Sequence, residues 1–391
     1  MTLDVDKSSW KRVAFGDVAR NVSETVRDPG EIGIDRIIAM EHMDPGALKV
    51  SRWGSTEENA TFTRRVTPGQ TLFGKRRAYQ RKVAFADFEA ICSGDIYTFE
   101  SIESQMLGEF LPFLVQSDEF FDHALGTSAG SLSPRTNWRD LANFKFDLPP
   151  LDEQKRIASL LWAVERHRLR LLDQVDDVYE LIEHVTVERL SELPTTKRLG
   201  ALATARSGPS YAASDVHASP SAESVPVLGI PNTKPDGTVD LSGIVHVTGL
   251  PDSVWRIDEA SLILIRTNGN RQRIGNTYLP PVRAYGHAVS AFQFLLQAHD
   301  KSDRDFLFRV LSESGMQQRM SKAASGSVGL GNLAVRWLNE QEIPWSPDAS
   351  ARAALVGELK QLSRVAESVS SEIAALAHLR SSLLSEIFGG N

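Results

Sequence analysis

The sequence repeats itself once, and this repeat limits the possible folds more than any other feature. At an offset of 196 residues, Asn143 matches Asn339 and Arg156 matches Arg352. Each copy runs from a globular stretch through a loop rich in Gly and Ser, a tryptophan and a proline-containing lead-in to a long segment of helical character. Self-similarity at a fixed offset indicates a repeated structural unit. We therefore predict two related globular domains, each followed by a long helix: residues 1–150, 151–195, 196–345 and 346–391.

Both predicted helices carry apolar residues in alternating steps of four and three, the pattern of a coiled-coil seam. The first helix follows Pro149 and Pro150, since proline can precede a helix but not continue inside one. Arg168 and Arg380 interrupt the two seams. Each helix could pack on its own domain or on another chain, but two equally long helices in one chain favour an antiparallel pair. The seam positions are Leu161, Val164, Leu171, Val175, Val178 and Ile182, then Leu359, Leu362, Val369, Ile373, Leu376 and Leu383.

The predicted fold class is α+β, with two mixed α/β domains joined and separated by two long antiparallel coiled-coil helices. Within the domains, short apolar runs between Gly, Pro and Asn turns predict strands. We expect strands at residues 81–88, 262–266 and 288–296, and helices at 107–121 and 303–321. Residues 209–226, rich in Ser, Ala and Pro, predict a mobile loop.

Composition narrows the class of protein. A chain of 391 residues exceeds one compact core, and its single cysteine excludes an intrachain disulfide framework and a cysteine-based zinc site. The sequence has no apolar run of the roughly 20 residues that a membrane span requires. We expect a cytoplasmic protein with no membrane partner.

Two segments of the sequence, called basic windows here, are positively charged although the net charge of the chain is -7. Neither Asp nor Glu occurs between Glu58 and Asp87 or between Glu259 and Asp300. Lys and Arg suit phosphates, Arg can pair with guanine, and Asn or Gln can pair with adenine. One such window alone would suggest a solvated hairpin, but two at similar places in a repeat favour binding of double-stranded DNA. With the Gly/Ser loops, the candidate DNA-binding residues are Lys75, Arg76, Arg77, Tyr79, Gln80, Arg81, Lys82, Ser128, Ser131, Arg135 and Asn137, then Arg266, Asn268, Asn270, Arg271, Gln272, Arg273, Ser325, Ser327 and Asn332.

Some short segments match the residue types of catalytic motifs, but the surrounding sequence does not match that of the corresponding enzymes. Ser128 lies in a Gly-x-Ser-x-Gly sequence, yet the next histidines fall on the predicted helix instead of in a hydrolase arrangement. Asp348, Glu358 and Lys360 resemble a nuclease pattern, but the last two lie on an amphipathic helix. P-loop, dinucleotide-binding and metal-binding spacings are missing from the sequence. We predict a non-catalytic chain without its own metal or cofactor.

Several segments together resemble the specificity subunit of Type I restriction-modification systems, over essentially the whole chain. The most specific is Pro-Pro-Leu-Asp-Glu-Gln-Lys-Arg-Ile at residues 149–157, followed by a heptad helix. Residues 72–77, 92–95, 264–269 and 383–390 add to the resemblance.

The resemblance implies two target recognition domains that each read half of a split DNA sequence, with helices that space the half-sites. It also implies two methyltransferase subunits docked on those helices, and a separate ATP-dependent restriction subunit. S-adenosylmethionine, ATP and Mg²⁺ would then belong to partners. The second lead-in departs from the first, since residues 344–352 retain Asp348 and Arg352 but lack the double proline. A competing interpretation is a repeat-containing coiled-coil scaffold without DNA specificity.

Overall fold

The computed structural model describes residues 6–57, 61–130, 133–326 and 330–389. The predicted DNA-binding residues Ser131 and Ser327 lie outside these ranges. The chain forms two compact units: residues 1–173 with 369–391, and residues 174–368. Each unit thus contains one globular part and about half of each long helix, α5 (Leu151–Ser191) and α9 (Ala349–Phe388). Within the described residues, no helix has the length and apolarity needed to cross a bilayer.

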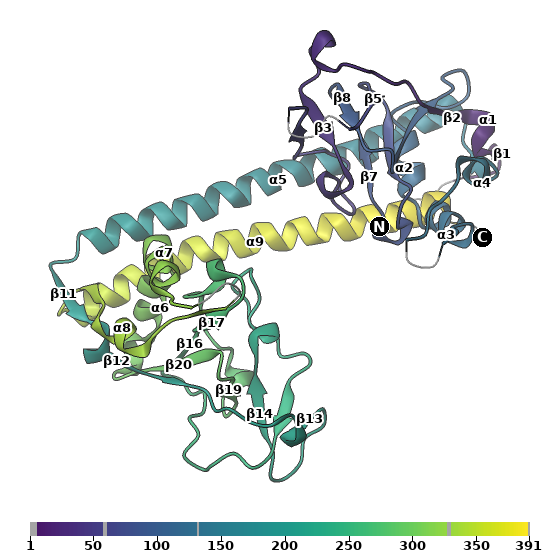
Figure 1. Cartoon of the computed structure of the whole chain (residues 1–391). Helices are drawn as coiled ribbons and strands as arrows, with labels where there is room; N and C mark the ends of the chain where they lie inside the picture. The colour runs from purple at the N-terminus through teal and green to yellow at the C-terminus, as the bar shows by residue number, and fades with distance from the viewer. Residues whose placement is uncertain (1–5, 58–60, 131–132, 327–329, 390–391) are drawn as a thin grey trace. The chain divides into compact units, whose positions relative to one another are not determined.

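The globular part of the first unit contains two four-stranded sheets (Figure 1). One is antiparallel in the order β2-β9-β6-β7; the other has the order β4-β3-β8-β5, with β3 parallel to β8. β1 pairs with β10 directly before α5. The strands are β1 (Lys11–Ala14), β2 (Ala19–Val22), β3 (Arg36–Ile38), β4 (Gly54–Ser55), β5 (Arg64–Val66), β6 (Thr71–Gly74), β7 (Val83–Phe85), β8 (Ala90–Cys92), β9 (Ile96–Ser101) and β10 (Lys145–Leu148). The helices are α1 (Phe15–Val18), η1 (Gly30–Ile32), η2 (Met40–His42), η3 (Ala78–Gln80), α2 (Leu111–Gln116), α3 (Asp118–Gly126) and α4 (Trp138–Ala142).

An aromatic cluster forms the centre of the first unit. Phe15, Phe73 and Phe120 are fully buried, and the Phe15 and Phe120 ring centroids lie 5.0 Å apart in an edge-to-face contact. Phe99 on β9 packs edge-to-face on Phe15 at 5.4 Å. Such contacts stabilise a core beyond the effect of buried area alone. The cluster therefore fixes α1 and α3 against the β2-β9-β6-β7 sheet.

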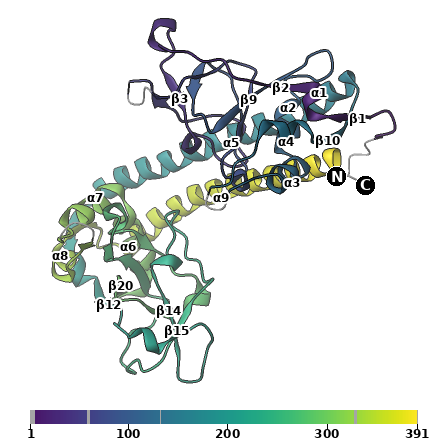
Figure 2. The same cartoon turned by 45° about the vertical axis from the view of Figure 1, so that its right-hand side comes forward.

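The second unit is also built on two four-stranded sheets, of whose strands Figure 2 labels β12, β14, β15 and β20. Their orders are β12-β20-β16-β18 and β13-β15-β14-β19, and two short pairs are β11–β22 and β17–β21. The strands are β11 (Thr195–Arg198), β12 (Ala203–Ser207), β13 (Val216–His217), β14 (Val225–Leu228), β15 (Val245–Val247), β16 (Ser261–Ile265), β17 (Thr267–Asn268), β18 (Thr277–Tyr278), β19 (Ala288–Val289), β20 (Gln293–Ala298), β21 (Gly331–Asn332) and β22 (Glu342–Trp345). The helices are η4 (Leu199–Ala201), η5 (Ala213–Asp215), η6 (Ile230–Asn232), η7 (Arg271–Arg273), η8 (Val282–Ala284), η9 (Lys301–Asp303), α6 (Arg304–Ser312), α7 (Ser314–Ala323) and α8 (Val335–Glu340).

The two units order their elements alike. The antiparallel sheet β2-β9-β6-β7 has the same connectivity as β12-β20-β16-β18, and the parallel pair β3–β8 corresponds to β14–β19. In each unit the first strand pairs antiparallel with the last, and a long helix follows. Helices α2 and α3 hold the same place in the order as α6 and α7. The offset found in the sequence thus coincides with a shared order of elements.

Several predicted elements are interrupted. The helix expected at 107–121 breaks at Ser117, whose hydroxyl caps α3 by accepting from the backbone N–H of Phe120 at 3.2 Å. Glu313 breaks the helix expected at 303–321 in the same way, accepting from Met316 N at 2.8 Å. Capping side chains such as these satisfy the free N–H groups of a new helix start. The periodicity correctly predicts helix in both segments, but the caps divide each segment into two helices.

The strand predictions need similar corrections. The strand expected at 262–266 is confirmed as β16, but that expected at 81–88 is only β7, because Arg81 adopts a left-handed backbone conformation (φ 53°). The run at 288–296 divides into β19 and β20 of different sheets. Ser290 makes this turn, since its backbone N–H donates to the Gln293 side chain at 3.2 Å. The loop expected at 209–226 contains β13 and the start of β14.

The seam residues of both long helices lie inside the units. All twelve predicted seam side chains are buried or half-buried. In the first unit, Leu161 of α5 and Leu383 of α9 join the same apolar cluster as Phe73 and Phe120. In the second unit, Leu359 of α9 joins the cluster around Phe306 and Leu264. The long helices thus contribute directly to the core of each unit.

The two arginines that interrupt the seams share one buried partner in the first unit, Glu165. Arg168 Nη2 lies 2.7 Å from Glu165 Oε1, and Arg380 Nη1 lies 2.8 Å from Oε2. Arg380 also donates to the carbonyl of Gly46, so this cluster connects both helices to the globular part. Burial alone would raise the pKa of Glu165, but the hydrogen bond from Arg168 and the charge of Arg380 outweigh it and hold the pKa below its ordinary value.

Substitution of Glu165 tests this cluster. Glu165→Leu is expected to lower the free energy of unfolding of the first unit by about 3–5 kcal/mol, because two buried guanidinium groups lose their carboxylate. Urea unfolding followed by tryptophan fluorescence measures this loss. In the wild type, the stabilisation should be present above about pH 4.3 and disappear as the pH falls through the lower folded-state pKa of Glu165.

The matched control is the triple variant Glu165→Leu, Arg168→Leu and Arg380→Met, which removes the three charges together. Replacing a whole buried ion cluster with apolar side chains is often close to neutral. The triple variant should therefore be more stable than Glu165→Leu. Equal stability of the two variants would show that Glu165 does not compensate the arginines.

Candidate nucleic-acid interface

The basic segment of the first unit lies against the Gly/Ser loop. Residues 75–82 connect β6 to β7, and the backbone N–H of Thr136 donates to the Lys75 carbonyl at 3.0 Å. The N–H of Arg77 donates to the Pro134 carbonyl at 2.8 Å, and Arg76 forms a β-bridge with Arg135. Two regions predicted separately from the sequence thus form one surface.

Arg76 and Arg135 share a carboxylate on this surface. Asp95, directly before β9, lies 3.3 Å from Arg76 Nη1 and 3.1 Å from Arg135 Nη2. Arg76 Nε also donates to Ser133 Oγ at 2.6 Å. The arginine side chains remain 42% and 56% exposed, whereas Asp95 is 20% exposed. Asp95 therefore holds two arginines side by side and leaves the group with a net positive charge.

Two other cations of this segment, Lys75 and Lys82, turn inward, and Arg81 packs against α3. Lys82 Nζ donates to the Met40 carbonyl at 2.6 Å, and Arg81 pairs with Asp118 and covers the Phe121 ring at 4.6 Å. Lys75 lies 4.7 Å from the centre of the Tyr97 ring. Burial, reinforced by the charge of Arg64, lowers the pKa of Lys75. These contacts give the three side chains structural roles.

Arg77, Tyr79 and Gln80 occupy the turn between Lys75 and Arg81. Arg77 and Tyr79 are exposed, Tyr79 at 55%, and Gln80 is half-buried. Arg77 has a backbone φ of 54°, a left-handed conformation that costs a non-glycine residue energy. Strain of this kind persists only where surrounding contacts hold it, and here Gln80 N donates to the Arg77 carbonyl at 2.9 Å. The turn is therefore rigid and presents Tyr79 to solvent.

Two polar residues of the Gly/Ser loop have local partners. Ser128 Oγ donates to the Ala124 carbonyl at 2.7 Å and lies 2.9 Å from Thr136 Oγ1. Asn137 is the N-cap residue of α4, and its side chain lies 3.4 Å from Asp140. Ser128 therefore ties the end of α3 to the loop, in contacts unlike those of a hydrolytic nucleophile.

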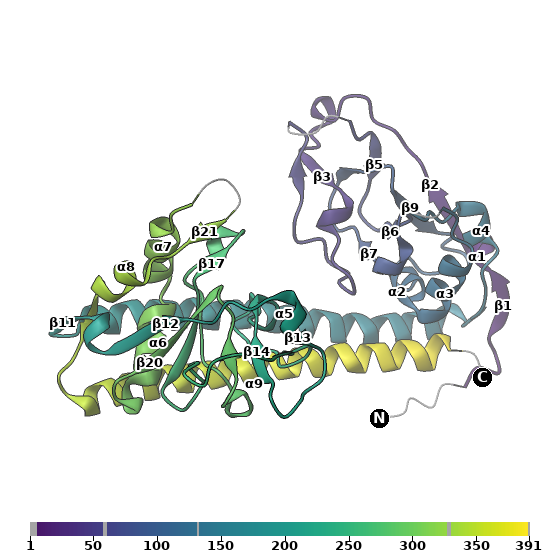
Figure 3. The ribbon, with the colours of Figure 1, turned by 60° about the horizontal axis from the view of Figure 1, so that its bottom comes forward.

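The second unit builds the equivalent surface from different side chains. β17 pairs with β21, both labelled in Figure 3, and the backbone N–H of Leu333 donates to the Arg266 carbonyl at 2.9 Å. Ser325 is exposed and exchanges two backbone hydrogen bonds with Asn332. The basic window and the Gly/Ser loop are therefore brought together in this unit too.

In the second basic window, as in the first, some cations turn inward and others are exposed to solvent. Arg273 turns inward and donates to the Thr233 carbonyl, and Arg266 donates to Ser207 Oγ at 2.7 Å. Arg271 is exposed, with Nη2 3.1 Å from the Gly326 carbonyl. Arg271 is thus the cation of this segment that is best placed to meet a ligand.

Three amides surround Arg271. Asn270 and Gln272 are exposed, and Asn268 is half-buried. The Asn268 side chain accepts from Asn270 N at 2.9 Å, and that of Asn270 accepts from Gln272 N at 3.0 Å. These bonds occupy the side-chain oxygens and direct the NH₂ donors away from the local backbone.

Sequence reasoning missed three residues of these surfaces: Asp95, Thr267 and Phe292. Thr267 Oγ1 donates to Asn332 Oδ1 at 2.8 Å, and the Phe292 side chain is 50% exposed. Asp95 and Phe292 each accept the backbone N–H of the first basic residue, Lys75 at 2.9 Å and Arg266 at 3.0 Å. An alignment of the two copies through β9 and β20 could have found Asp95 and Phe292, because each directly precedes its strand.

The helix starts are anchored by different chemistry. The buried amide of Gln154 accepts from Leu107 N and donates to the carbonyl of Gln105, both at 2.9 Å. In the second unit Arg352, also buried, pairs with Asp303 at 2.6 Å and donates to the Ser346 carbonyl. The second lead-in can therefore lack the double proline and still hold its helix.

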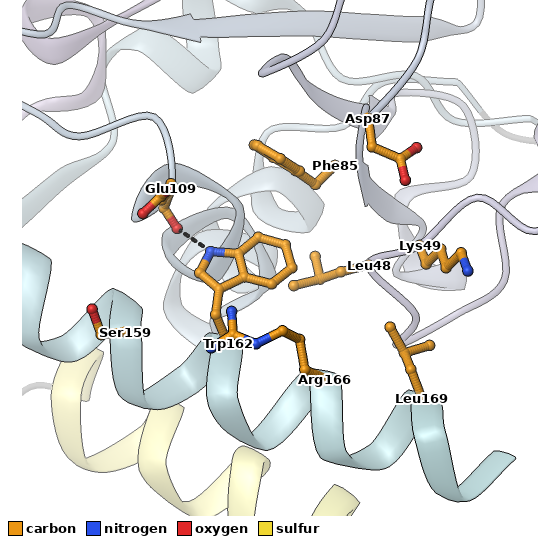
Figure 4. Close-up of a pocket in the computed structure, with 9 residues that line it drawn as sticks. All are labelled: Leu48, Lys49, Phe85, Asp87, Glu109, Ser159, Trp162, Arg166 and Leu169. Atoms are coloured by element: carbon orange, nitrogen blue, oxygen red, sulfur yellow. Dashed lines mark hydrogen bonds between the residues drawn. The ribbon is translucent and has the colours of Figure 1, made fainter. Parts of the chain in front are cut away.

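A cavity of about 360 Å³ lies beside α5 in the first unit (Figure 4). Trp162 is one of the residues that line it, and its ring lies 5.2 Å from that of Phe85 and 5.1 Å from that of Phe113. Its Nε1 donates to the Glu109 carbonyl at 2.9 Å. Trp162 therefore attaches α5 to the globular part of the first unit.

The nuclease-like residues have separate structural partners. Asp348 accepts from Ser350 N at 2.8 Å, Glu358 pairs with Arg189 at 3.2 Å, and Lys360 pairs with Asp305. Within the described ranges, no group of three or more His, Cys, Asp or Glu side chains is arranged to hold a metal ion. The candidate site therefore consists of the two loop surfaces.

Comparison with known proteins identifies relatives of this chain. Residues 38–177 match the family model of the Type I restriction modification DNA specificity domain. The Type I restriction enzyme EcoDI specificity subunit of Escherichia coli is 24% identical over 187 residues, which cover 47% of this chain and 41% of that protein. The match thus spans less than half the length of that relative.

Two solved structures share the fold. One, from work on complex assembly and conformational transition of the type I R-M system, has a TM-score of 0.62 and 18% identity over 98% of both chains. The Type-I restriction-modification system S subunit from M. genitalium has a TM-score of 0.57 and 14% identity over 100% of both chains. Both likenesses extend over nearly the whole chain.

Variants of Arg77 separate its strain from its charge. Arg77→Gly and Arg77→Ala both remove the guanidinium, but only glycine accepts the left-handed backbone without strain. We expect Arg77→Gly to be more stable than Arg77→Ala by about 1 kcal/mol in thermal or urea unfolding. If alanine is as stable as glycine, the turn changes conformation in the variants and the native conformation is not imposed by its surroundings.

Proposed function

We propose that this chain, which belongs to the family of Type I restriction-modification specificity subunits, binds DNA and reads a two-part target sequence. Each unit would read one half-site through its loop surface. The chain itself would be non-catalytic and would carry no cofactor or metal. Because its target is genomic and invading DNA, it would act in the cytoplasm.

The observation that carries this proposal is the pair of equivalently built loop surfaces. Each has a basic segment held by backbone hydrogen bonds against a Gly/Ser loop, at Lys75–Thr136 and at Arg266–Leu333. Exposed or half-exposed Arg, Asn and Gln side chains occur on both. These side chains suit contacts with phosphates and base edges. Two such surfaces in one chain support a target of two half-sites.

We further propose that α5 and α9 set the distance between the half-sites as an antiparallel pair. Both helices are continuous through both units, with 41 and 40 residues. The first half of α5 packs with the second half of α9 in the first unit, and the remaining halves share the second unit. The length of such a pair is fixed by the number of residues, at about 1.5 Å each.

The helices are also our proposed docking surface for two methyltransferase subunits. α5 exposes the large apolar side chains Leu151, Leu160, Tyr179, Leu181 and Val187, whereas Val365 is the one exposed on α9 among the described residues. Exposed apolar groups on a helix favour burial against a partner. We therefore assign the larger share of this contact to α5. S-adenosylmethionine would be bound by the methyltransferase subunits, and ATP and Mg²⁺ by an ATP-dependent restriction subunit.

Exchange of one globular part tests the two-part target. Residues 1–150 or 196–345 are replaced by the corresponding part of a homologous subunit, and the complex with its methyltransferase is expressed in a host whose methylated sites are then sequenced. Each exchange should change one half of the methylated motif and leave the other half unchanged. A scaffold without DNA specificity predicts that neither half responds.

Matched insertions test the spacing. Seven residues added between 173 and 174 and seven between 368 and 369 should lengthen each helix by roughly 10 Å, or about 3 base pairs. Sequencing of methylated sites should find unchanged half-sites with a longer gap. The control is the insertion in α5 alone, which places the two seams out of register and should reduce methylation. An unchanged gap with full methylation would contradict the role of helix length.

A further inference from the structure

The two loop surfaces differ in chemistry at one structurally equivalent position. In the first unit Arg76 and Arg135 lie on paired backbone segments with Asp95 between their side chains. In the second unit the equivalent paired residues are Thr267 and Asn332. Matching backbone hydrogen bonds define this equivalence. The carbonyls of Lys75 and Arg266 accept from the N–H groups of Thr136 and Leu333. The N–H groups of Lys75 and Arg266 donate to the carbonyls of Asp95 and Phe292.

From this difference we infer that the two half-sites contain different base pairs at this position. The first unit would recognise a G·C pair with Arg76 and Arg135, and the second an A·T pair with Asn332 and Phe292. This inference rests on the proposed function and assigns specificity-determining residues to each surface.

The arginine pair has the geometry for guanine. A guanidinium group carries five N–H donors in a planar fork and can donate two of them to O6 and N7 of guanine. Ser133 and Asp95 engage two of the five donors of Arg76 within the described residues. Asp95 binds two nitrogens of Arg135, Nε at 3.2 Å and Nη2 at 3.1 Å, but only Nη1 of Arg76. Each guanidinium therefore retains N–H donors beyond those that Asp95 binds. One carboxylate beside two arginines also leaves net positive charge for the DNA backbone.

The second surface has the chemistry for an A·T pair. The hydrogen bond from Thr267 occupies one lone pair of Asn332 Oδ1 and fixes the amide, which retains its NH₂ donors and a second lone pair. Asparagine in this state can contact both N6 and N7 of adenine. Phe292 takes the place of Asp95 and exposes half of its ring. An apolar ring suits the methyl group of thymine and provides no partner for the amino group of cytosine.

Single substitutions in the assembled methyltransferase complex test the assignment. Methylation is measured on a DNA library in which every position of both half-sites is randomised. Arg135→Ala should reduce the preference for guanine at one position of one half-site by about 10-fold to 100-fold and leave the other half-site unchanged. Arg135→Lys keeps the charge but loses the fork, so it should restore overall binding without restoring the preference. Asn332→Ala and Phe292→Ala should relax an A·T preference at one position of the other half-site.

The controls are exposed residues outside the two surfaces. Arg20 pairs with Glu100 near the opposite end of β9 from Asp95, and Val282 is an exposed apolar residue of the second unit. Arg20→Ala and Val282→Ala should leave both half-sites unchanged. Thermal unfolding of each variant establishes that it is folded.

The outcomes separate this inference from the function on which it rests. A split motif whose base preferences do not change in Arg135→Ala, Asn332→Ala or Phe292→Ala would overturn the inference and leave the two-part function standing. The inference would also be overturned if the assignments were reversed, so that the Asn332→Ala or Phe292→Ala variant lost a preference for guanine in the second half-site. The absence of a split motif in the wild type would instead contradict the proposed function.

Discussion

The structure depends on the burial of the helix seams in cores that they share with the globular parts. In the first unit Phe110 of the globular part contacts Phe388 at the end of α9, with ring centroids 5.5 Å apart, and Leu161 of α5 joins the same cluster. Without the two helix segments this cluster would be open to water on one side. Each globular part and its two helix segments therefore form one cooperative core, which also supports the loop surface of that unit.

The order of domains and long helices could be predicted from the sequence because periodic patterns indicate it. The seam spacing, the prolines before α5 and the 196-residue offset each depend on local geometry, and they predicted both long helices and the order of elements. Glu165 was not predicted as the partner of Arg168 and Arg380. Helical spacing brings Glu165 near Arg168, but its contact with Arg380 requires a second helix, 215 residues away in sequence.

The candidate site was predictable in its location and not in its details. The two basic windows and the two Gly/Ser loops were found separately, and each window does lie against its loop. Which cations turn inward depends on distant partners, Met40 for Lys82 and Thr233 for Arg273. Sequence composition treats these arginines and lysines as equivalent, although tertiary contacts assign several of them to the protein interior.

Both loop surfaces are held together mainly by backbone hydrogen bonds. Thr136 and Leu333 donate to the carbonyls of Lys75 and Arg266, and the N–H groups of the latter pair donate to the carbonyls of Asp95 and Phe292. Backbone bonds of this kind place few demands on side-chain identity. A carboxylate and a phenyl ring can therefore occupy the same place in two units of the same fold. This separation of scaffold from side chain gives a physical reason why one repeated architecture can carry two chemically different loop surfaces.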